Sequence, residues 1–220
     1  MGLTVSVAPH PLLQIGAFST HFGQPLASLV TPDALLTELS PGARRPFEPQ
    51  LPSDEDRTEV RKLLRHGGFK PSGRSKPASE YLQAAYAENR FPRINAPVDA
   101  CNIASLFSGL PISLIDLDRV NGALSVSICP MGTTYVFNPS GQVIDAGGLL
   151  AVYDSEGPTG TPVKDAQRTK THDDTRNTLA IVWGTSALPG RTAATTAWYR
   201  ELVSRIPGAT SDDVRVAASG

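Results

Sequence analysis

One stretch of the chain, "NAPVDACNIASLFSGLPISLIDLD", concentrates residue types that could do chemistry. Cys101 could act as a nucleophile if a base and a helix N-terminus lowered the pKa of its thiol. Asp99 and Asn102 are three positions apart and share one face of a helix that a proline can open. The free N–H groups of residues 98–100 could donate to an anion or to a developing oxyanion. The stretch therefore predicts a polar site at the start of a helix.

Each of these residues also has a structural interpretation. The sequence shows no base for Cys101, although His172 could approach it in the fold. The favoured interpretation is that Cys101 is a small buried residue that packs beside Asn102 and Ser105. Asp99 could complete the local capping of the helix or orient a ligand, and the sequence does not decide between the two.

Two further segments are rich in charge. Residues 163–177, "VKDAQRTKTHDDTRN", mix both signs; a solvated loop of paired charges is the default, and a binding loop is the sharper alternative. The segment from residue 57 to residue 76 carries seven basic residues and one acid, Glu59. These basic residues are Arg57, Arg61, Lys62, Arg65, Lys70, Arg74 and Lys76. On charge alone a solvated helix face is favoured, and contact with phosphates is the alternative.

Several kinds of site are excluded by their missing motifs. The chain contains no CxxC, HxxxH, HExxH, GxxxxGK[ST], GxGxxG or GxSxG pattern, so we expect neither a metal nor a cofactor. The net charge of −1 gives no global sign of a polyanion partner. Two cysteines fit a reducing cytoplasm, and apolar runs such as "LAIVW" are too short to span a bilayer.

Alternating and helical patterns divide the 220 residues into short elements. The expected strands are "LTVSVAP", "LLQIGAFSTHF", "ALSVSIC", "TTYVFN", "GLLAVYD" and "NTLAIVWG". The expected helices are "TPDALLTEL" with Thr31 as its cap, "SDEDRTEVRKLLRHGG" with Ser53 as its cap, "KPASEYLQAAYAENR", the helix from Pro97, and "RTAATTAWYRELVSRI". "GPTGTP" has the composition of a turn. This order predicts an α+β fold with a mixed, mainly antiparallel sheet flanked by helices, as one domain over residues 1–210 with a frayed tail at 211–220.

Three segments together resemble a free-standing B3/B4 domain. They are "GFKPSGRSKPASEYL", "PRINAPVDACNIASLFSGLPISLIDLDRVNGALSV" and "QRTKTHDDTRNTLAIV", and the resemblance is best over residues 57–185. Its most specific part is a run formed by Asn95, Val98, Asp99, Asn102, Gly109, Pro111 and Asp116. The same fold is found in the editing domain of the beta subunit of bacterial phenylalanyl-tRNA synthetase, which hydrolyses tyrosine wrongly attached to phenylalanine tRNA.

The resemblance implies an aminoacyl-tRNA deacylase that acts in trans. Three positions depart from the synthetase: Cys101 replaces a threonine, Ser113 replaces a histidine, and Ile181 replaces the glutamate that reads the tyrosine hydroxyl. Specificity for tyrosine is therefore not carried over. The absence of a catalytic triad does not exclude hydrolysis, because an aminoacyl ester is already activated and needs only a positioned water and oxyanion donors.

The resemblance implies the following roles. Asn102, with the amides at 98–100, holds the carbonyl, and Ser113 and Thr171 place the water, while the amino-acid pocket is formed by Asp99, Cys101, Pro111 and Ile181. The acceptor end of tRNA is held by Arg61, Lys62, Arg65, Lys70, Arg74, Lys76, Arg93, Arg168 and Lys170. The expected partner is tRNA, with no DNA and no membrane. The alternatives are a non-catalytic module that binds tRNA or a free amino acid, and an unrelated small-molecule enzyme, for example one that uses aminoacyl-tRNA as an acyl donor.

Overall fold

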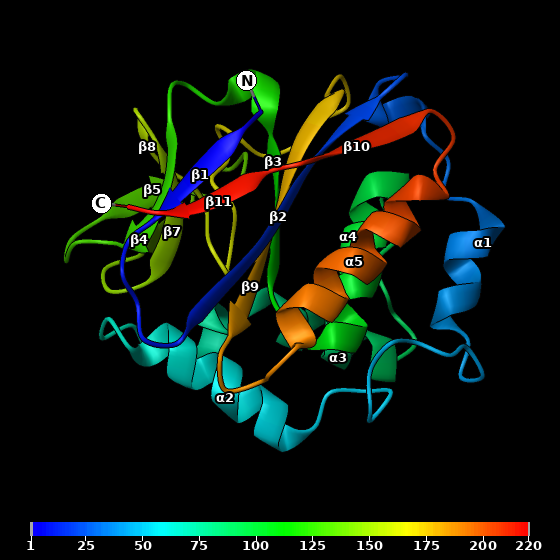
Figure 1. Ribbon diagram of the computed structural model, residues 1–220, viewed down its shortest axis with the longest axis horizontal. Coiled ribbons are helices and arrows are strands. Elements are labelled where there is room, and N and C mark those ends of the chain that lie inside the picture. The colour runs from blue at the N-terminus through cyan, green and yellow to red at the C-terminus, as the bar shows by residue number, and fades with distance from the viewer. Residues whose placement is uncertain (1, 220) are drawn as a thin grey trace.

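The computed structural model describes residues 2–219, and Figure 1 shows its elements. Within these residues the α-helices are α1 (Asp33–Leu36), α2 (Asp54–Arg65), α3 (Ala78–Ala87), α4 (Ala96–Ser108) and α5 (Arg191–Ser204). Short 3₁₀ helices are η1 (Leu26–Ser28), η2 (Thr37–Leu39), η3 (Gly73–Ser75) and η4 (Leu117–Arg119). The strands are β1 (Thr4–Val7), β2 (Leu13–Phe22), β3 (Ile112–Asp116), β4 (Leu124–Ile128), β5 (Thr134–Val136), β6 (Val143–Asp145), β7 (Leu150–Asp154), β8 (Gly157–Gly160), β9 (Asn177–Thr185), β10 (Ala209–Asp213) and β11 (Arg215–Ala218).

A four-stranded antiparallel sheet occupies the centre of the fold, with strand order β10-β2-β9-β3. Its longest pairing joins β2 to β9 from Leu13 opposite Thr185 to His21 opposite Asn177. The β-branched and aromatic side chains of β9 suit a strand that is covered on both faces. In Figure 1, α4 and α5 lie on one side of this sheet, and β1, β4 and β7 lie on the other.

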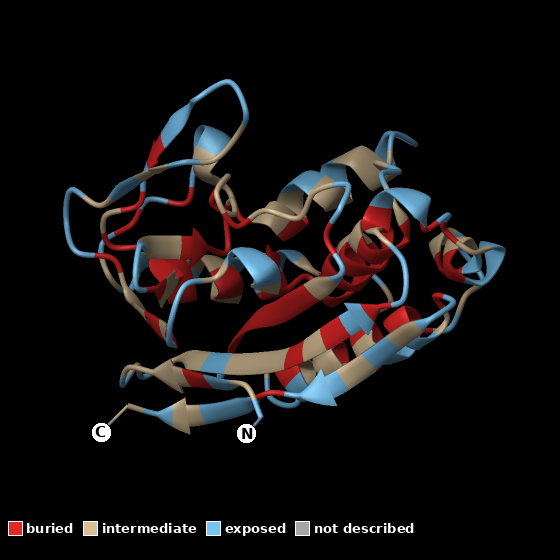
Figure 2. Ribbon diagram, turned by 90° about the horizontal axis from the view of Figure 1, so that it is seen from above, coloured by how far each residue is buried: buried red, intermediate tan, exposed pale blue. Residues whose placement is uncertain are grey.

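The two faces of the central sheet belong to two separate hydrophobic cores. Ala180 and Val182 of β9 pack with Phe107 of α4 and Trp198 of α5. The alternate side chains of β9, including Trp183, pack with the second sheet and with α2. This division follows from the alternation of side chains along a strand. Figure 2 shows the buried residues concentrated in the interior between the strands and the helices.

The second sheet has five strands in the order β11-β1-β4-β7-β8. β1 is parallel to both of its neighbours, whereas β4, β7 and β8 pair antiparallel. β5 and β6 form a separate hairpin, which rests on the loop after β8 through the bond from the N–H of Gln167 to the carbonyl of Val136. No helix of residues 2–219 is long and apolar enough to cross a bilayer.

The α+β class with mixed, mainly antiparallel sheets is confirmed, and the local sequence signals explain several helix starts. Ser53 forms a capping box with Asp56 at α2, because the hydroxyl accepts from the N–H of Asp56 and the carboxylate accepts from the N–H of Ser53. At α4, the Asn95 side chain accepts from the N–H of Val98 at 3.1 Å. Thr31 is not the cap of α1; its hydroxyl donates to Asp99 instead.

Two local expectations are wrong. "GPTGTP" contains β8 rather than a turn, because pairing with β7 supplies the backbone partners that its composition does not predict. Residues 211–218 are not frayed: they belong to β10, which pairs with β2, and to β11, which pairs with β1. Val214, between these two strands, is buried in the second core.

A glycine in β9 lets α5 lie directly on the central sheet. A Cβ atom at Gly184 would overlap the Oγ1 atom of Thr192 on α5. We therefore expect Gly184→Ala to lower the free energy of unfolding by about 1–3 kcal/mol through overpacking, as measured by urea denaturation. Gly42→Ala is the control, because a Cβ there meets nothing within 4 Å. Equal effects of the two substitutions would contradict this role of Gly184.

Candidate functional site

The N-terminus of α4 is already satisfied by its own chain. The N–H of Val98 is bonded to the Asn95 side chain, and the N–H of Asp99 donates to the Asn95 carbonyl at 2.8 Å. Ala100 lies where intrahelical bonding to residue 96 begins. The amides at 98–100 are therefore not free to hold an oxyanion, and this part of the sequence-based site is corrected.

Asp99 ties together the segments that precede α4. Its side chain is 1% exposed. The carboxylate accepts from the hydroxyl of Thr31 at 2.6 Å, from the N–H of Ile94 at 2.8 Å and from Nε of Arg93 at 3.1 Å. These contacts favour the structural interpretation of Asp99, and they place Arg93 in an ion pair with it.

Cys101 and Pro111 lie in the interior. Cys101 belongs to the core between α4 and the central sheet, and burial raises the pKa of its thiol to about 12. It is therefore a neutral thiol and not a nucleophile, as the favoured interpretation required. His172 is not beside it: Nε2 of His172 lies 3.1 Å from the Asp116 carboxylate. Pro111 is buried, and its carbonyl accepts the N–H of Trp183.

Ser113 and Ile181 pair across β3 and β9 and are both fully buried. The Ser113 hydroxyl accepts from Nε1 of Trp183 at 2.9 Å and donates to the Thr161 carbonyl at 3.2 Å. Ile181 packs in the second core, on the face of the sheet away from α4. Neither residue contacts solvent, so Ser113 cannot place a water and Ile181 cannot line a pocket beside α4. Both assignments are corrected.

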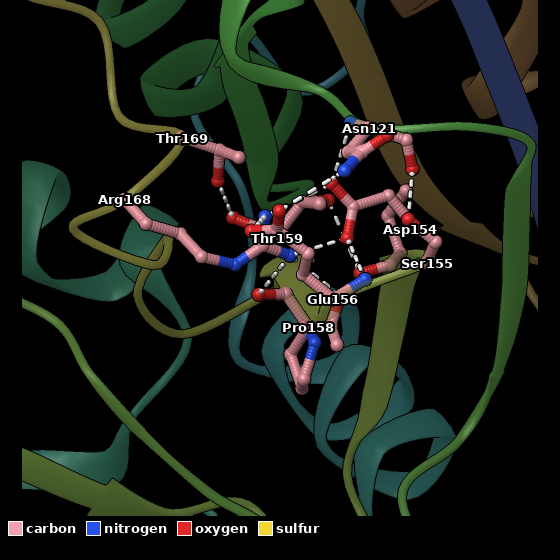
Figure 3. Close-up of polar contacts among 10 residues, drawn as sticks. Asn121, Asp154, Ser155, Glu156, Pro158, Thr159, Arg168 and Thr169 are labelled. Carbon is pink, nitrogen blue, oxygen red and sulfur yellow. Dashed lines mark hydrogen bonds and ion pairs between the residues drawn. The ribbon is translucent and has the colours of Figure 1, made fainter.

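Arg168 forms hydrogen bonds to β7 and β8 instead of facing a ligand. Figure 3 shows its guanidinium pointing at Asp154, to which it donates bonds of 2.9 and 2.6 Å. It also donates to the carbonyls of Gly157 and Pro158. The Asp154 carboxylate further accepts the N–H of Asn121. The role predicted for Arg168, anchoring the terminal nucleotide, is corrected, because these bonds occupy the guanidinium.

The remaining basic residues fall into paired and unpaired sets. Arg61 forms a two-bond ion pair with Glu80, at 2.6 and 2.5 Å, and Lys62 pairs with Glu59 at 2.6 Å. Within residues 2–219 the basic residues of this segment with no carboxylate oxygen within 4.0 Å are Arg65, Lys70, Arg74 and Lys76. These unpaired cations are the ones that could meet phosphates.

Asn102 and Arg74 lie in the same cleft. The cleft has a volume of about 460 Å³ and lies between η3, α3, α4 and the loop that follows β8. Its lining residues are Arg74, Ala78, Tyr81, Leu82, Asn102, Val163 and Lys164. Apolar walls with a few convergent polar groups are typical of a ligand site. Larger clefts of about 680 Å³ beside α5 and about 540 Å³ beside α2 contain none of the predicted catalytic residues.

Two of the residues that line this cleft, Arg74 and Lys164, are cations, and Lys170 lies close enough to Lys164 to repel it. Burial lowers the pKa of Lys164, and the positive charges of Arg74 and Lys170 lower it further. The Lys164 ammonium lies 3.8 Å from the centre of the Phe137 ring, and Lys170 donates to the Phe137 carbonyl at 2.6 Å. Three like charges that repel one another predict affinity for an anion, which would relieve the repulsion.

Asp165 is a functional candidate that the sequence interpretation placed among paired loop charges. Its two oxygens accept N–H bonds from Thr161 at 3.3 Å and Leu114 at 3.2 Å. Burial raises its pKa to about 6, although the hydrogen bond from Leu114 and the charge of Lys170 favour the ionised form. The sequence signal was available: a dense polar run directly follows a strand. Thr171 lies on the same loop and is partly exposed.

No group of three His, Cys, Asp or Glu side chains within the described part of the chain is arranged to hold a metal ion.

The fold and the cleft define an α+β domain in which an antiparallel sheet is covered by helices on one face and by a mixed sheet on the other. The B3/4 domain family matches residues 70–197, and the chain belongs to this family. The resemblance to B3/B4 domains is thereby confirmed, with the matched range displaced toward the C-terminus relative to residues 57–185.

One solved structure similar to this chain is an N-terminal fragment of the phenylalanyl-tRNA synthetase beta subunit from Pyrococcus horikoshii. The TM-score is 0.53 and the identity is 12%, over 99% of this chain and 52% of that chain. The chain therefore spans about half the length of that fragment. At this identity the likeness shows the fold alone. No curated protein matches the chain.

Proposed function

We propose that this protein is a trans-acting aminoacyl-tRNA deacylase, which removes a wrongly attached amino acid by hydrolysing its ester bond to tRNA. Membership of the B3/4 family and the shared fold with a tRNA synthetase fragment support a tRNA-related role. The observation that carries the proposal is the presence of the Asn102 amide in a cleft that Arg74 and Lys164 also line. Such a cleft offers a hydrogen-bond donor to a carbonyl beside charges that suit phosphates. A cytoplasmic location, where tRNA is charged, belongs to the same proposal.

In this proposal the Asn102 carboxamide donates to the ester carbonyl and to the oxyanion that forms from it. Leu82 and Val163 provide apolar walls for the amino-acid side chain. Arg74 and Lys164 hold the phosphates of the tRNA 3′ end, and Lys70 and Lys76 extend the positive surface toward the acceptor stem. Each group acts on a bound ester that is already activated, so positioning supplies much of the rate.

Lys170 and Thr171 remain in the proposed site, beside the water. The Lys170 ammonium uses one N–H bond to the Phe137 carbonyl, which leaves two N–H groups for a ligand. Thr171 is partly exposed on the same loop, and its hydroxyl can orient a water. Cys101 contributes only to the packing behind Asn102.

Release of labelled amino acid tests the proposal. The protein, in excess, is mixed with a panel of correctly charged and mischarged tRNAs, and free amino acid is followed over time. We expect release from at least one mischarged tRNA, and a large loss of release in Asn102→Ala. Asn89→Gly is the matched control, since it removes an exposed amide and glycine accepts the positive φ of 55° at that position.

Three outcomes separate the candidate functions. Binding of tRNA with no release from any substrate would favour the non-catalytic module. Consumption of the ester with a product other than free amino acid would favour an acyl transferase. Release that persists unchanged in Asn102→Ala would show that the site lies elsewhere.

A further inference from the structure

A second cleft lies against a neighbouring face of α3. It has a volume of about 540 Å³ and lies between α2, α3 and the segment that precedes α2. Residues three or four positions apart on a helix share one face, and α3 presents one such face to each cleft. Its residues in the cleft with Asn102 are Ala78, Tyr81 and Leu82, and its residues in the second cleft include Glu80, Tyr81, Ala84 and Ala87. Tyr81 belongs to both sets, so its side chain borders both clefts.

Tyr81 is exposed and yet held in place. It is 44% exposed, and its hydroxyl donates to the carbonyl of Gly73 at 3.0 Å, which joins α3 to η3. Arg74 of η3 lines the cleft with Asn102, and Lys76, which directly follows η3, lines the second cleft. The aromatic ring therefore stands between two clefts that each have a cation in their lining.

Positive charge exceeds negative charge in the second cleft, where Arg57, Arg61 and Lys76 accompany one carboxylate, Glu80. Arg61 bonds to that carboxylate through Nε and Nη2, so three of its five N–H groups have no partner among residues 2–219. Lys76 has no carboxylate oxygen within 4.0 Å in the same range. Arg57 pairs with Asp54, which is 88% exposed, and such a surface pair is weak enough for a phosphate to replace it.

Apolar side chains complete the second cleft. Leu51, Pro52 and Leu106 line it, and Leu51 is 48% exposed. A cationic groove beside an exposed aromatic ring is the combination that binds single-stranded nucleic acid, because the cations follow the phosphates while a base stacks on the ring. A nucleotide uses the ring as well as the cations, whereas the carboxylates of an acidic peptide use the cations alone.

We propose that the second cleft holds a nucleotide of the single-stranded 3′ end of tRNA, whose base stacks on Tyr81; this inference rests on the proposed function for the identity of the RNA. The terminal nucleotide, which carries the amino-acid ester, lies in the cleft with Asn102. The strand passes Tyr81, and the phosphate of the preceding nucleotide lies against Lys76 and Arg61. Tyr81 is thus a positioning residue, which fixes the strand so that the ester meets Asn102.

Titrations of the full chain with three probes test this inference. The probes are a short single-stranded RNA with the sequence of the tRNA 3′ end, a strand of the same length without bases, and an acidic peptide of equal charge. We expect the RNA to bind more tightly than the other two, because it alone offers bases to Tyr81. Equal affinity for the RNA and for either of the other probes overturns the inference.

Two substitutions of Tyr81 separate stacking from the bond to Gly73. Tyr81→Ala removes the ring and should weaken RNA binding by about 5–150-fold, the effect of losing one stacked base. Tyr81→Phe keeps the ring and should bind within about threefold of the wild type. A merely structural role of the hydroxyl would weaken binding equally in both variants, and that result overturns the inference. Met131→Ala is the control, since it removes a 78% exposed apolar side chain outside both clefts.

Lys76→Ala tests the phosphate contact. The slope of log affinity for the RNA against log salt concentration should fall by about 0.7, the contribution of one phosphate of a single strand. Arg215→Ala, which removes an exposed cation outside both clefts, is the control and should change the slope less. An unchanged slope in Lys76→Ala, or an equal change in the two variants, overturns the placement of the phosphate.

Failure of this inference is distinguishable from failure of the proposed function, because the titrations do not require release of amino acid. If the wild type releases no amino acid from any tRNA and still binds the RNA through Tyr81, the deacylase proposal fails and the strand site stands. If it releases amino acid but Tyr81→Ala binds the RNA as the wild type does, this inference alone is overturned. If Tyr81→Ala does not fold, photocross-linking of the wild type to a strand with reactive bases decides: cross-links to residues 73–87 support the inference, and cross-links only elsewhere overturn it.

Discussion

Replacing Arg168 with methionine is expected to lower the free energy of unfolding by about 2–4 kcal/mol. Breaking a fully buried ion pair by removing one partner costs roughly 3–5 kcal/mol, because the other charge stays buried without compensation. Here the Asp154 side chain is 0% exposed and the Arg168 side chain is 31% exposed, so solvent can replace part of the lost interaction. Methionine keeps most of the stem and removes the charge. Chemical denaturation of both proteins measures the difference.

Arg65→Met is the control for this prediction, since Arg65 is exposed and has no carboxylate within 4.0 Å among the described residues. Similar losses of unfolding free energy in the two variants would show that the ion pair between Arg168 and Asp154 does not contribute to stability.

The pH dependence of stability gives a second check. Burial alone would raise the pKa of Asp154, but the bonds from Arg168, Asn121 and Glu156 outweigh burial and lower it. The stabilisation is therefore present above the ordinary aspartate pKa and is lost as the pH falls through the lower value in the folded protein.

Replacing Arg74 and Lys164 together with alanine is expected to weaken tRNA binding and to reduce its dependence on salt. Each contact with a phosphate of a single strand contributes about 0.7 to the slope of log affinity against log salt concentration. The double variant should therefore lose about 1.4 from that slope. Binding titrations between 50 and 200 mM salt, which is about the range over which such contacts weaken, measure it.

The control for this second prediction removes two cations elsewhere. Arg44 and Arg215 are both exposed and lie outside the cleft, so their replacement by alanine lowers the net charge equally. An equal loss of slope in the control would indicate general attraction by the whole surface. An unchanged slope in Arg74→Ala/Lys164→Ala would show that tRNA phosphates do not bind in this cleft.

Local signals in the sequence were sufficient where secondary structure depends on neighbouring residues. The short run of apolar, β-branched and aromatic residues in "NTLAIVWG" predicted β9, and Ser53 followed by Asp56 marked the start of α2. They were insufficient where a distant strand supplies the partners. β8 is a strand because β7 lies beside it, and β10 is one because β2 does.

The site shows a similar division. Asn102, which was singled out from its spacing on a helix, lines the cleft between α3 and α4. Ser113 was misplaced because side chains alternate along β3: Ile112 and Leu114 face the core beneath α4, whereas Ser113 points to the opposite side of the sheet. Arg168 carries the same charge whether it binds a phosphate or Asp154, and only the fold reveals its partner. The raised pKa of Asp165 was not predicted, because the burial that causes it cannot be read from a polar loop.

The parallel pairing of β1 with β11 has a kinetic consequence. It joins opposite ends of the described chain, with Thr4 beside Arg215 and Val7 beside Ala218. Ends that meet only after the intervening segments have condensed raise the mean separation of contacting residues, which slows the search for the native topology. Refolding on a timescale of roughly milliseconds to seconds, slower than for helical bundles, is therefore expected, with this sheet edge closing late.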